Sequence, residues 1–231
     1  MANFQNRVEG LTQLALTGDT NPTVTELNDF LRDGVLDVTN KCIEMDPREA
    51  EKFQRESAII NSNGGLEIKG AQILSVMREA SADGSSDGSS AWYPCRKISP
   101  NLQSRVVDPD SLDYASIYNP VFTIIDYNKV HVYPVPDATN DGFKVFYVNQ
   151  EPTDQSNNAD LVYSHTNIKY FPNDKVGLVV LYASIKTLEA AAGSKAADED
   201  VELQQSYVAL ANTLKAEYMT AFQKSQQQQA R

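Results

Sequence analysis

Hydrophobic residues recur with the period of an α-helix in the first third of the chain. After a capping box at Thr23–Glu26, apolar residues three to four positions apart predict an amphipathic helix. Its stripe consists of Leu27, Leu31, Val35, Val38 and Cys42. A short helix is expected over 4–16. Asp46 followed by Pro47 predicts a further helix that ends near Ser57.

The last third shows the same period. A wide apolar face after Pro172 predicts a helix packed on two sides, which Gly193 is expected to end. A second helix is expected to start near residue 200, where several acids suit a helix N-terminus. Its apolar seam consists of Leu203, Tyr207, Leu210, Leu214 and Tyr218. The glutamine-rich segment 223–231 is expected to be a flexible tail.

The middle of the chain changes to two-residue alternation and is interrupted by Gly, Pro and Ser, as is typical of short strands. The expected strands are 66–68, 73–78, 121–127, 129–133 and 143–148. A short helix is expected after Pro100, and the polar segment 81–90 is expected to be a flexible loop.

Two of these strands bracket a Pro-x-Pro sequence. Strands 129–133 and 143–148 are expected to form a hairpin whose first arm is ended by Pro134 and Pro136, because proline cannot donate a ladder hydrogen bond. In the return strand, Phe143, Val145 and Tyr147 share one face. The opposite face is also partly apolar, so a partner surface could cover it.

Together these patterns predict an α+β protein. The N- and C-terminal segments are expected to form a mainly α-helical bundle with a central inserted antiparallel β module. The expected segments are N-terminal helices over 1–57, a β-rich insert over 58–171, long helices over 172–222 and the tail over 223–231.

Charge narrows the classes of function. The net charge is −11, from 31 acidic against 20 basic residues, and the Lys and Arg residues are scattered. Stand-alone nucleic-acid binding normally needs a basic patch, so this class is disfavoured. An acidic surface suits a passage through which DNA slides without sticking. No uninterrupted apolar stretch of spanning length and no secretory signal is recognised. The two cysteines, Cys42 and Cys95, favour synthesis in a reducing cytoplasm.

Candidate chemistry is sparse. His131 and His165 are not part of a cluster with metal-ligand spacing. Cys95 has two cationic neighbours that could lower its pKa, but no catalytic partner signature is present. The segments "DGSSDG" and "DPDSLD" lack the glutamate that an EF-type calcium loop needs, which favours turn formation. No catalytic residue, cofactor or metal site is therefore expected.

Aromatic residues are concentrated between Trp92 and Phe171. Some must form the core of the β module, and tyrosine is also enriched at protein interfaces. The candidate interface residues are Tyr133, Phe143, Phe146, Tyr147, Tyr218, Phe222, Gln226 and Gln227.

Three motifs together carry a resemblance. The arm "VYPVP", the return strand "FKVFYVNQEPT" and the later "YFPNDKVGLVVLYASIKTLEAA" occur in this order, and "WYP" at 92–94 fits the start of the β module. This layout resembles the tailed-phage adaptor proteins, the head–tail connectors that dock beneath the portal. The order of elements matches over 23–220, and the detailed match covers 129–192.

The resemblance implies a virion structural protein of the neck, synthesised in the host cytoplasm and without enzymatic activity. It implies a ring, usually of twelve copies, around an axial DNA channel. The implied partners are further copies of the chain, the portal protein, a tail or nozzle protein, and DNA passing through the lumen without sequence-specific binding. The segment 219–231 is the candidate for reaching the portal.

Alternative functions remain open from the sequence. The chain could be a tail terminator or tail-completion component, although two long C-terminal helices speak against this alternative. It could also be a non-enzymatic module whose aromatic β face binds carbohydrate or a host ligand. An enzyme that uses Cys95 or the acidic loops is the weakest alternative.

Overall fold

The computed structural model describes residues 2–62, 64–68, 72–80, 91–126, 129–136, 141–155, 159–197 and 200–229, without the side chains of Ala197 and 224–229. The protein is mixed α and β, with 47% of its residues helical. The segment 81–90, expected to be a flexible loop, lies outside the described residues. The chain divides into two compact units. We call residues 1–52 with 151–231 the helical unit, and residues 53–150 the β unit.

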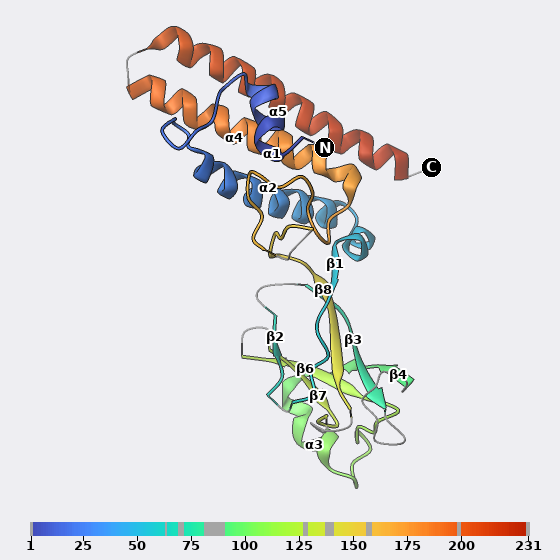
Figure 1. Cartoon of the computed structure of the whole chain (residues 1–231). Helices are drawn as coiled ribbons and strands as arrows, with labels where there is room; N and C mark the ends of the chain where they lie inside the picture. The colour runs from blue at the N-terminus through green and yellow to red at the C-terminus, as the bar shows by residue number, and fades with distance from the viewer. Residues whose placement is uncertain are drawn as a thin grey trace. The chain divides into compact units, whose positions relative to one another are not determined.

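The helical unit is built around α4 (Val176–Ala197), which follows the 3₁₀ helix η3 (Asn173–Lys175). This helix contacts α1 (Phe4–Thr12), α2 (Val24–Met45) and α5 (Val201–Gln229). Figure 1 shows α4 and α5 lying side by side as an antiparallel pair. By length and composition α4 could span a membrane, but most of it is buried against its neighbours, as in a core helix. The expectation of a helix packed on more than one side is confirmed.

The capping and spacing signals of α2 are confirmed. The hydroxyl of Thr23 accepts a hydrogen bond from the Glu26 backbone N–H at 3.2 Å, and the Glu26 carboxylate accepts one from the Thr23 N–H at 2.7 Å. All five residues of the predicted apolar stripe are buried. Gly34 allows α2 to approach α4 closely, since a Cβ atom there would lie 3.1 Å from Cδ1 of Tyr182.

Four predicted helix boundaries are wrong. α1 ends at Thr12 and does not continue to residue 16. Residues 47–57 form a 3₁₀ helix, η1 (Pro47–Phe53), followed by strand β1 (Gln54–Glu56), because residues 54–56 pair with β8. Gly193 does not end α4, which continues to Ala197, since glycine only weakens a helix. The backbone of α5 is helical to Gln229, within the segment for which a flexible tail was expected.

The segment 151–171 belongs to the helical unit and not to the β-rich part of the chain. Backbone N–H groups of Phe4 and Gln5 donate to carbonyls of His165 and Tyr163, each at 3.0 Å. From α2, the Arg32 guanidinium donates to the Leu161 carbonyl at 3.1 Å. These hydrogen bonds attach an irregular segment to two helices, which sequence periodicity cannot indicate.

The described strands form two four-stranded sheets. One has the order β1–β8–β3–β4, with β8 (Phe143–Val148), β3 (Ile73–Ala80) and β4 (Ala91–Pro94). The other has the order β2–β7–β6–β5, with β2 (Leu66–Glu67), β7 (Lys129–Tyr133), β6 (Val121–Ile125) and β5 (Arg96–Lys97). The core lies between the sheets and contains buried residues from both: Ile68, Val76, Phe122, Val130, Val132, Phe143 and Val145.

The hairpin prediction is wrong, although both of its strands exist. β7 pairs with β2 and β6, whereas β8 pairs with β1 and β3 in the other sheet. The connection between them therefore crosses from sheet to sheet. The β unit is also not wholly antiparallel. β5 and β6 run parallel, because the 3₁₀ helix η2 (Pro100–Leu102) and α3 (Gln103–Val107) lie between them and allow a crossover.

Arg78 on β3 holds this connection between the sheets. Its side chain is 2% exposed. Its guanidinium donates to the Pro134 carbonyl at 2.9 Å, to the backbone carbonyl of Glu79 at 2.7 Å and to the Asp141 carboxylate at 2.5 Å. Pro134 follows β7 and Asp141 precedes β8. The Pro-x-Pro segment therefore begins where β7 ends, and the carbonyl of Pro134 accepts a hydrogen bond from the buried Arg78 side chain.

Candidate interaction surfaces

The candidate residues in the β unit have different environments. Phe143 is 1% exposed and belongs to the core, so it is removed from the candidate surface. The hydroxyl of Tyr133 accepts a hydrogen bond from Gln103 at 2.7 Å, and its ring contacts a small cluster under α3. Tyr147 is half-buried against the core between the sheets. Phe146 points to the other face of β8 and remains partly exposed.

Tyr218 and Phe222 hold α5 in place. Both are 5% exposed, and their rings make an edge-to-face contact with centroids 4.9 Å apart. The Tyr218 hydroxyl donates to the Asp37 carboxylate at 2.5 Å, and that carboxylate also pairs with Lys41 at 2.8 Å. These residues therefore attach α5 to α2 and are not free for a partner. The side chains of Gln226 and Gln227 lie outside the described residues.

Changing Tyr218 to Phe is expected to lower the free energy of unfolding by about 1–2 kcal/mol at neutral pH, because Asp37 loses a buried donor. Burial, together with the hydrogen bond to Asp37, raises the pKa of Tyr218. A raised folded-state pKa means that the stability is complete below pH about 10 and is lost as the pH rises further. The Phe variant should therefore lose less stability above that pH.

Urea unfolding at pH 7 and 10.5 measures both effects, and Tyr114→Phe at an exposed position is the control. An unchanged difference between the two pH values would contradict this assignment.

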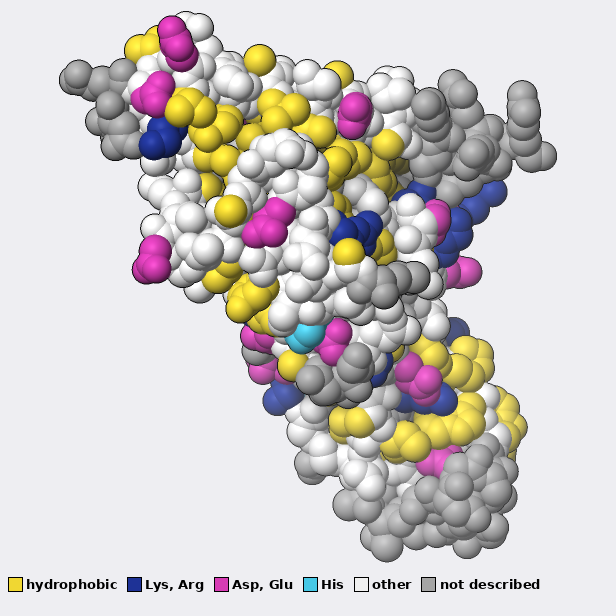
Figure 2. Space-filling view, turned by 45° about the horizontal axis from the view of Figure 1, so that its top comes forward, with side chains coloured by type: hydrophobic (Ala, Val, Ile, Leu, Met, Phe, Trp, Pro, Cys, Tyr) yellow, Lys and Arg dark blue, Asp and Glu magenta, His cyan; other side chains and the backbone are white. Residues whose placement is uncertain are grey.

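The outer face of the β1–β8–β3–β4 sheet carries aromatic rings beside a cation. The Lys144 ammonium lies 4.5 Å from the Trp92 ring centroid and 5.6 Å from that of Phe146. It also pairs with Glu56 at 2.7 Å. Figure 2 shows hydrophobic side chains intermingled with charged ones on the β unit. The cation is internally satisfied, so this face offers mainly apolar ring surface.

The segment after α3 is a second exposed apolar feature, which sequence reasoning missed. Leu112 is fully exposed, and Val107 and Tyr118 are more than half exposed. The backbone between them is held by turns: the N–H of Ser111 donates to the Asp108 carbonyl at 3.0 Å, and that of Ala115 to the Val106 carbonyl at 3.0 Å. The signal in the sequence was a leucine isolated among turn-forming residues.

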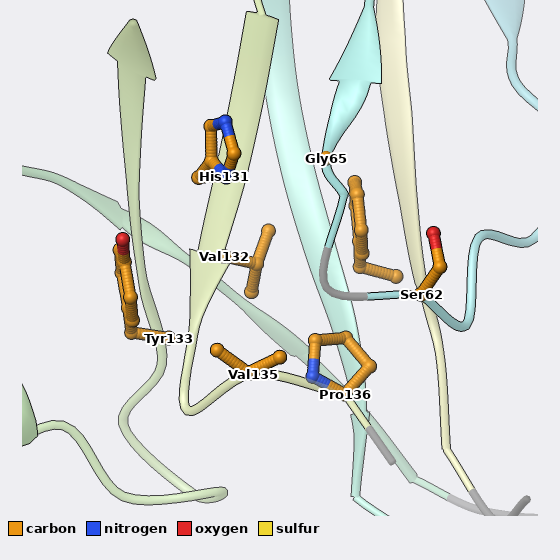
Figure 3. Close-up of a pocket in the computed structure, with 8 residues that line it drawn as sticks. Ser62, Gly65, His131, Val132, Tyr133, Val135 and Pro136 are labelled. Atoms are coloured by element: carbon orange, nitrogen blue, oxygen red, sulfur yellow. The ribbon is translucent and has the colours of Figure 1, made fainter. Parts of the chain in front are cut away.

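One cavity described in the β unit is too small for a substrate. A cavity of 40 Å³ lies beside β7 and is lined by Ser62, Gly65, His131, Val132, Tyr133, Val135, Pro136 and Phe143. Figure 3 shows that the labelled lining residues come from β7, from the residues that follow it and from the segment before β2. Phe143 of β8 completes the lining. Ligand pockets typically have volumes of about 300–1,000 Å³, so this cavity is suited to water. Gly65 has φ +71°, and a Cβ there would lie 2.7 Å from the Val130 carbonyl.

The histidines lie in separate units. Burial lowers the pKa of His131, and neighbouring Lys129 lowers it further. His165 accepts a hydrogen bond from the Val162 N–H at 3.2 Å and lies 3.8 Å from the Asp154 carboxylate. Within the described residues, no group of three or more His, Cys, Asp and Glu side chains is arranged to hold a metal ion.

The cysteine thiols are buried or partly buried. Burial raises the pKa of Cys95 to about 12, and the nearby Arg78 guanidinium only partly opposes this effect. Burial also raises the pKa of Cys42. The expectation that cationic neighbours lower the pKa of Cys95 is thus wrong, because its side chain contacts the core between the sheets.

Neither thiol of the native chain is expected to react appreciably with iodoacetamide at pH 7, because both stay protonated and largely shielded. Both should react after unfolding in urea. Mass spectrometry measures the extent of labelling, and Ala216→Cys on the exposed face of α5 supplies a reactive control. Labelling of native Cys95 as fast as that of the control would contradict this prediction.

The sequence matches no protein-family model and no curated protein.

Proposed function

We propose that this protein is a virion adaptor that forms a ring beneath the portal, joins the DNA-filled head to the tail and extends the DNA channel. The observation that carries the proposal is the order of the chain. The β unit is inserted between α2 and α4, which contact each other. This order is the one that the resemblance to tailed-phage adaptors implies. In this proposal the helices form the bundle of the ring body, and the β unit is the inserted module.

The surface of α5 supports a role in assembly. Between Leu203 and Gln223 its only charged residues are Lys215 and Glu217, and Lys215 pairs with Glu189 of α4 at 2.7 Å. Four large apolar side chains of this helix are exposed: Val201, Leu203, Val208 and Met219. A helix face with few charges and several apolar side chains suits contact with another subunit.

The charge balance supports the proposed position in the virion neck. With a net charge of −11, the lumen of a ring would repel DNA, which could pass without sequence-specific binding. The partners in this proposal are further copies of the chain, the portal protein and a tail or nozzle protein. The work of the protein is then contact and shape.

Co-expression with the portal protein encoded by the same phage tests the proposal. A complex seen by electron microscopy as a second ring coaxial with the portal is the expected result. Removing residues 224–231, which include Gln226 and Gln227, should abolish portal binding without changing the unfolding midpoint. A chain that remains separate from the portal protein over a range of salt and protein concentrations would overturn the proposal.

A further inference from the structure

The β unit displays two surface features of opposite charge. The first, which we call the acidic loop, is residues 108–114 with Leu112 at its centre. The second, which we call the basic edge, consists of Arg96, Lys97, Tyr93 and Tyr118. We propose that the acidic loop of one copy docks on the basic edge of a second copy, and this contact deepens the proposed ring and rests on it.

The acidic loop is an ordered protrusion. Its backbone is fixed by the N–H of Tyr114 donating to the Ser111 carbonyl at 3.1 Å and by the N–H of Asp110 donating to the Asp108 carboxylate at 3.1 Å. These turns hold Leu112 fully exposed, with Tyr114 43% exposed. Holding an apolar side chain in water has no benefit for a single copy, whereas a partner surface would bury it.

The charges of the loop are largely unused within the copy. Asp113 is 3.7 Å from Arg105, and both side chains are about half exposed or more. Among the described residues, Asp110 has no ion pair. The three aspartates of the loop against Arg105 leave an excess of negative charge around Leu112.

The basic edge complements the loop in charge and in apolar surface. β5 ends its sheet, so one side of the strand is open. Arg96 and Lys97 are exposed, and in the described part of the chain neither has a carboxylate within 4.0 Å. The Arg96 guanidinium donates a hydrogen bond of 3.3 Å to the Asn119 side-chain carbonyl. The rings of Tyr93 and Tyr118 meet edge to face with centroids 5.6 Å apart and offer apolar surface for Leu112.

A second copy is the occupant that fits both features together. Among the described residues of one copy, the cations of the edge and Asp110 of the loop have no ion-pair partner, and each feature supplies the charge that the other lacks. Because each copy carries one loop and one edge, the contact is heterologous and repeats from copy to copy. Such a contact closes into a ring when the rotation permits.

Charge reversal tests the contact in the full chain. One variant carries Arg96→Glu and Lys97→Glu, and the other carries Asp110→Lys and Asp113→Lys. Each variant alone should self-associate about a hundredfold more weakly than the wild type, because like charges then face each other. Mixing the two variants should restore association. The acidic loop of the edge variant still fits the basic edge of the loop variant, and the reversed, acidic edge fits the reversed, basic loop. Leu112→Asp in the otherwise unchanged chain should also weaken self-association.

Sedimentation velocity on the chain alone and electron microscopy with the portal protein are the readouts. The unfolding midpoint reported by Trp92 fluorescence should be the same in all variants, which separates weakened contact from unfolding. The contact would be overturned if both charge-reversed variants still form the ring, or if their mixture fails to reassociate, while portal binding remains intact. Loss of portal binding with self-association retained would overturn the adaptor function instead. A wild type that assembles neither alone nor on the portal would overturn both.

Discussion

Replacing Arg78 with methionine is expected to lower the free energy of unfolding of the β unit by about 3–5 kcal/mol. The guanidinium is 2% exposed and donates to the Pro134 carbonyl, the Glu79 carbonyl and the Asp141 carboxylate. Methionine fills much of the same volume but donates nothing. The partly buried Pro134 carbonyl and Asp141 carboxylate would then lose a donor, which costs more than the net value of the hydrogen bonds.

Trp92 is the only tryptophan of the chain and lies in the β unit, so its fluorescence in urea follows this unit. The matched control is Arg105→Ala, since the ion pair of Arg105 with Asp113 is exposed and its loss should cost less than about 1 kcal/mol. Arg78→Lys should fall between the two, because one ammonium cannot match the planar fork of donors. Equal midpoints for Arg78→Met and the control would show that this arginine does not hold the connection between the sheets.

Leu188→Ala is expected to lower the free energy of unfolding of the helical unit by about 2–5 kcal/mol. Leu188 is 0% exposed and lies on α4, the helix that contacts α1, α2 and α5. Truncation to alanine removes apolar surface and leaves a cavity that neighbouring helices cannot easily fill. Loss of stability in α4 should affect the whole helical unit.

Circular dichroism at 222 nm follows the helical unit, which contains most of the helical residues. Leu203→Ala on α5 is the control, because its side chain is 40% exposed and should change stability by less than about 1 kcal/mol. If Leu188→Ala unfolds at the same urea concentration as this control, α4 is not the centre of the helical core.

Local signals predicted the helices well. The capping box at Thr23 and the stripe of α2 depend on residues close in sequence, and both are present in the structure. The errors came from effects outside the local pattern. Residues 54–56 have helix-compatible side chains, but they pair with residues 146–148, which lie at least 90 positions later. Gly193 is a weak helix former that the surrounding α4 tolerates.

The five predicted strands are present within a few residues of their expected bounds, but β1, β4 and β5 were not predicted and the expected pairing of β7 with β8 was wrong. Alternation in β7 and β8 shows which residues share a face, and it does not show which strand lies beside them. The tight succession of two strands favoured a hairpin, whereas Pro134 and its carbonyl bond to Arg78 direct the chain to the second sheet. A contact between residues 78 and 134 has no local signature.

Aromatic content gave only part of the candidate surface. Phe146 is partly exposed as expected, while Phe143, three positions earlier, is a core residue. Both have the same side chain, and only the sheet that covers one of them decides its role. Leu112 was missed for the opposite reason, since one apolar residue in a turn has no period to detect.

The ends of the β unit lie side by side. β1 and β8 are antiparallel neighbours, Gln54 lies opposite Val148, and the Asn149 N–H donates to the Phe53 carbonyl at 3.0 Å. The chain therefore leaves the insertion next to the point where it entered. During evolution such a module can be replaced, enlarged or shortened as one unit. The rest of the chain then has to bridge only the distance between two neighbouring strands.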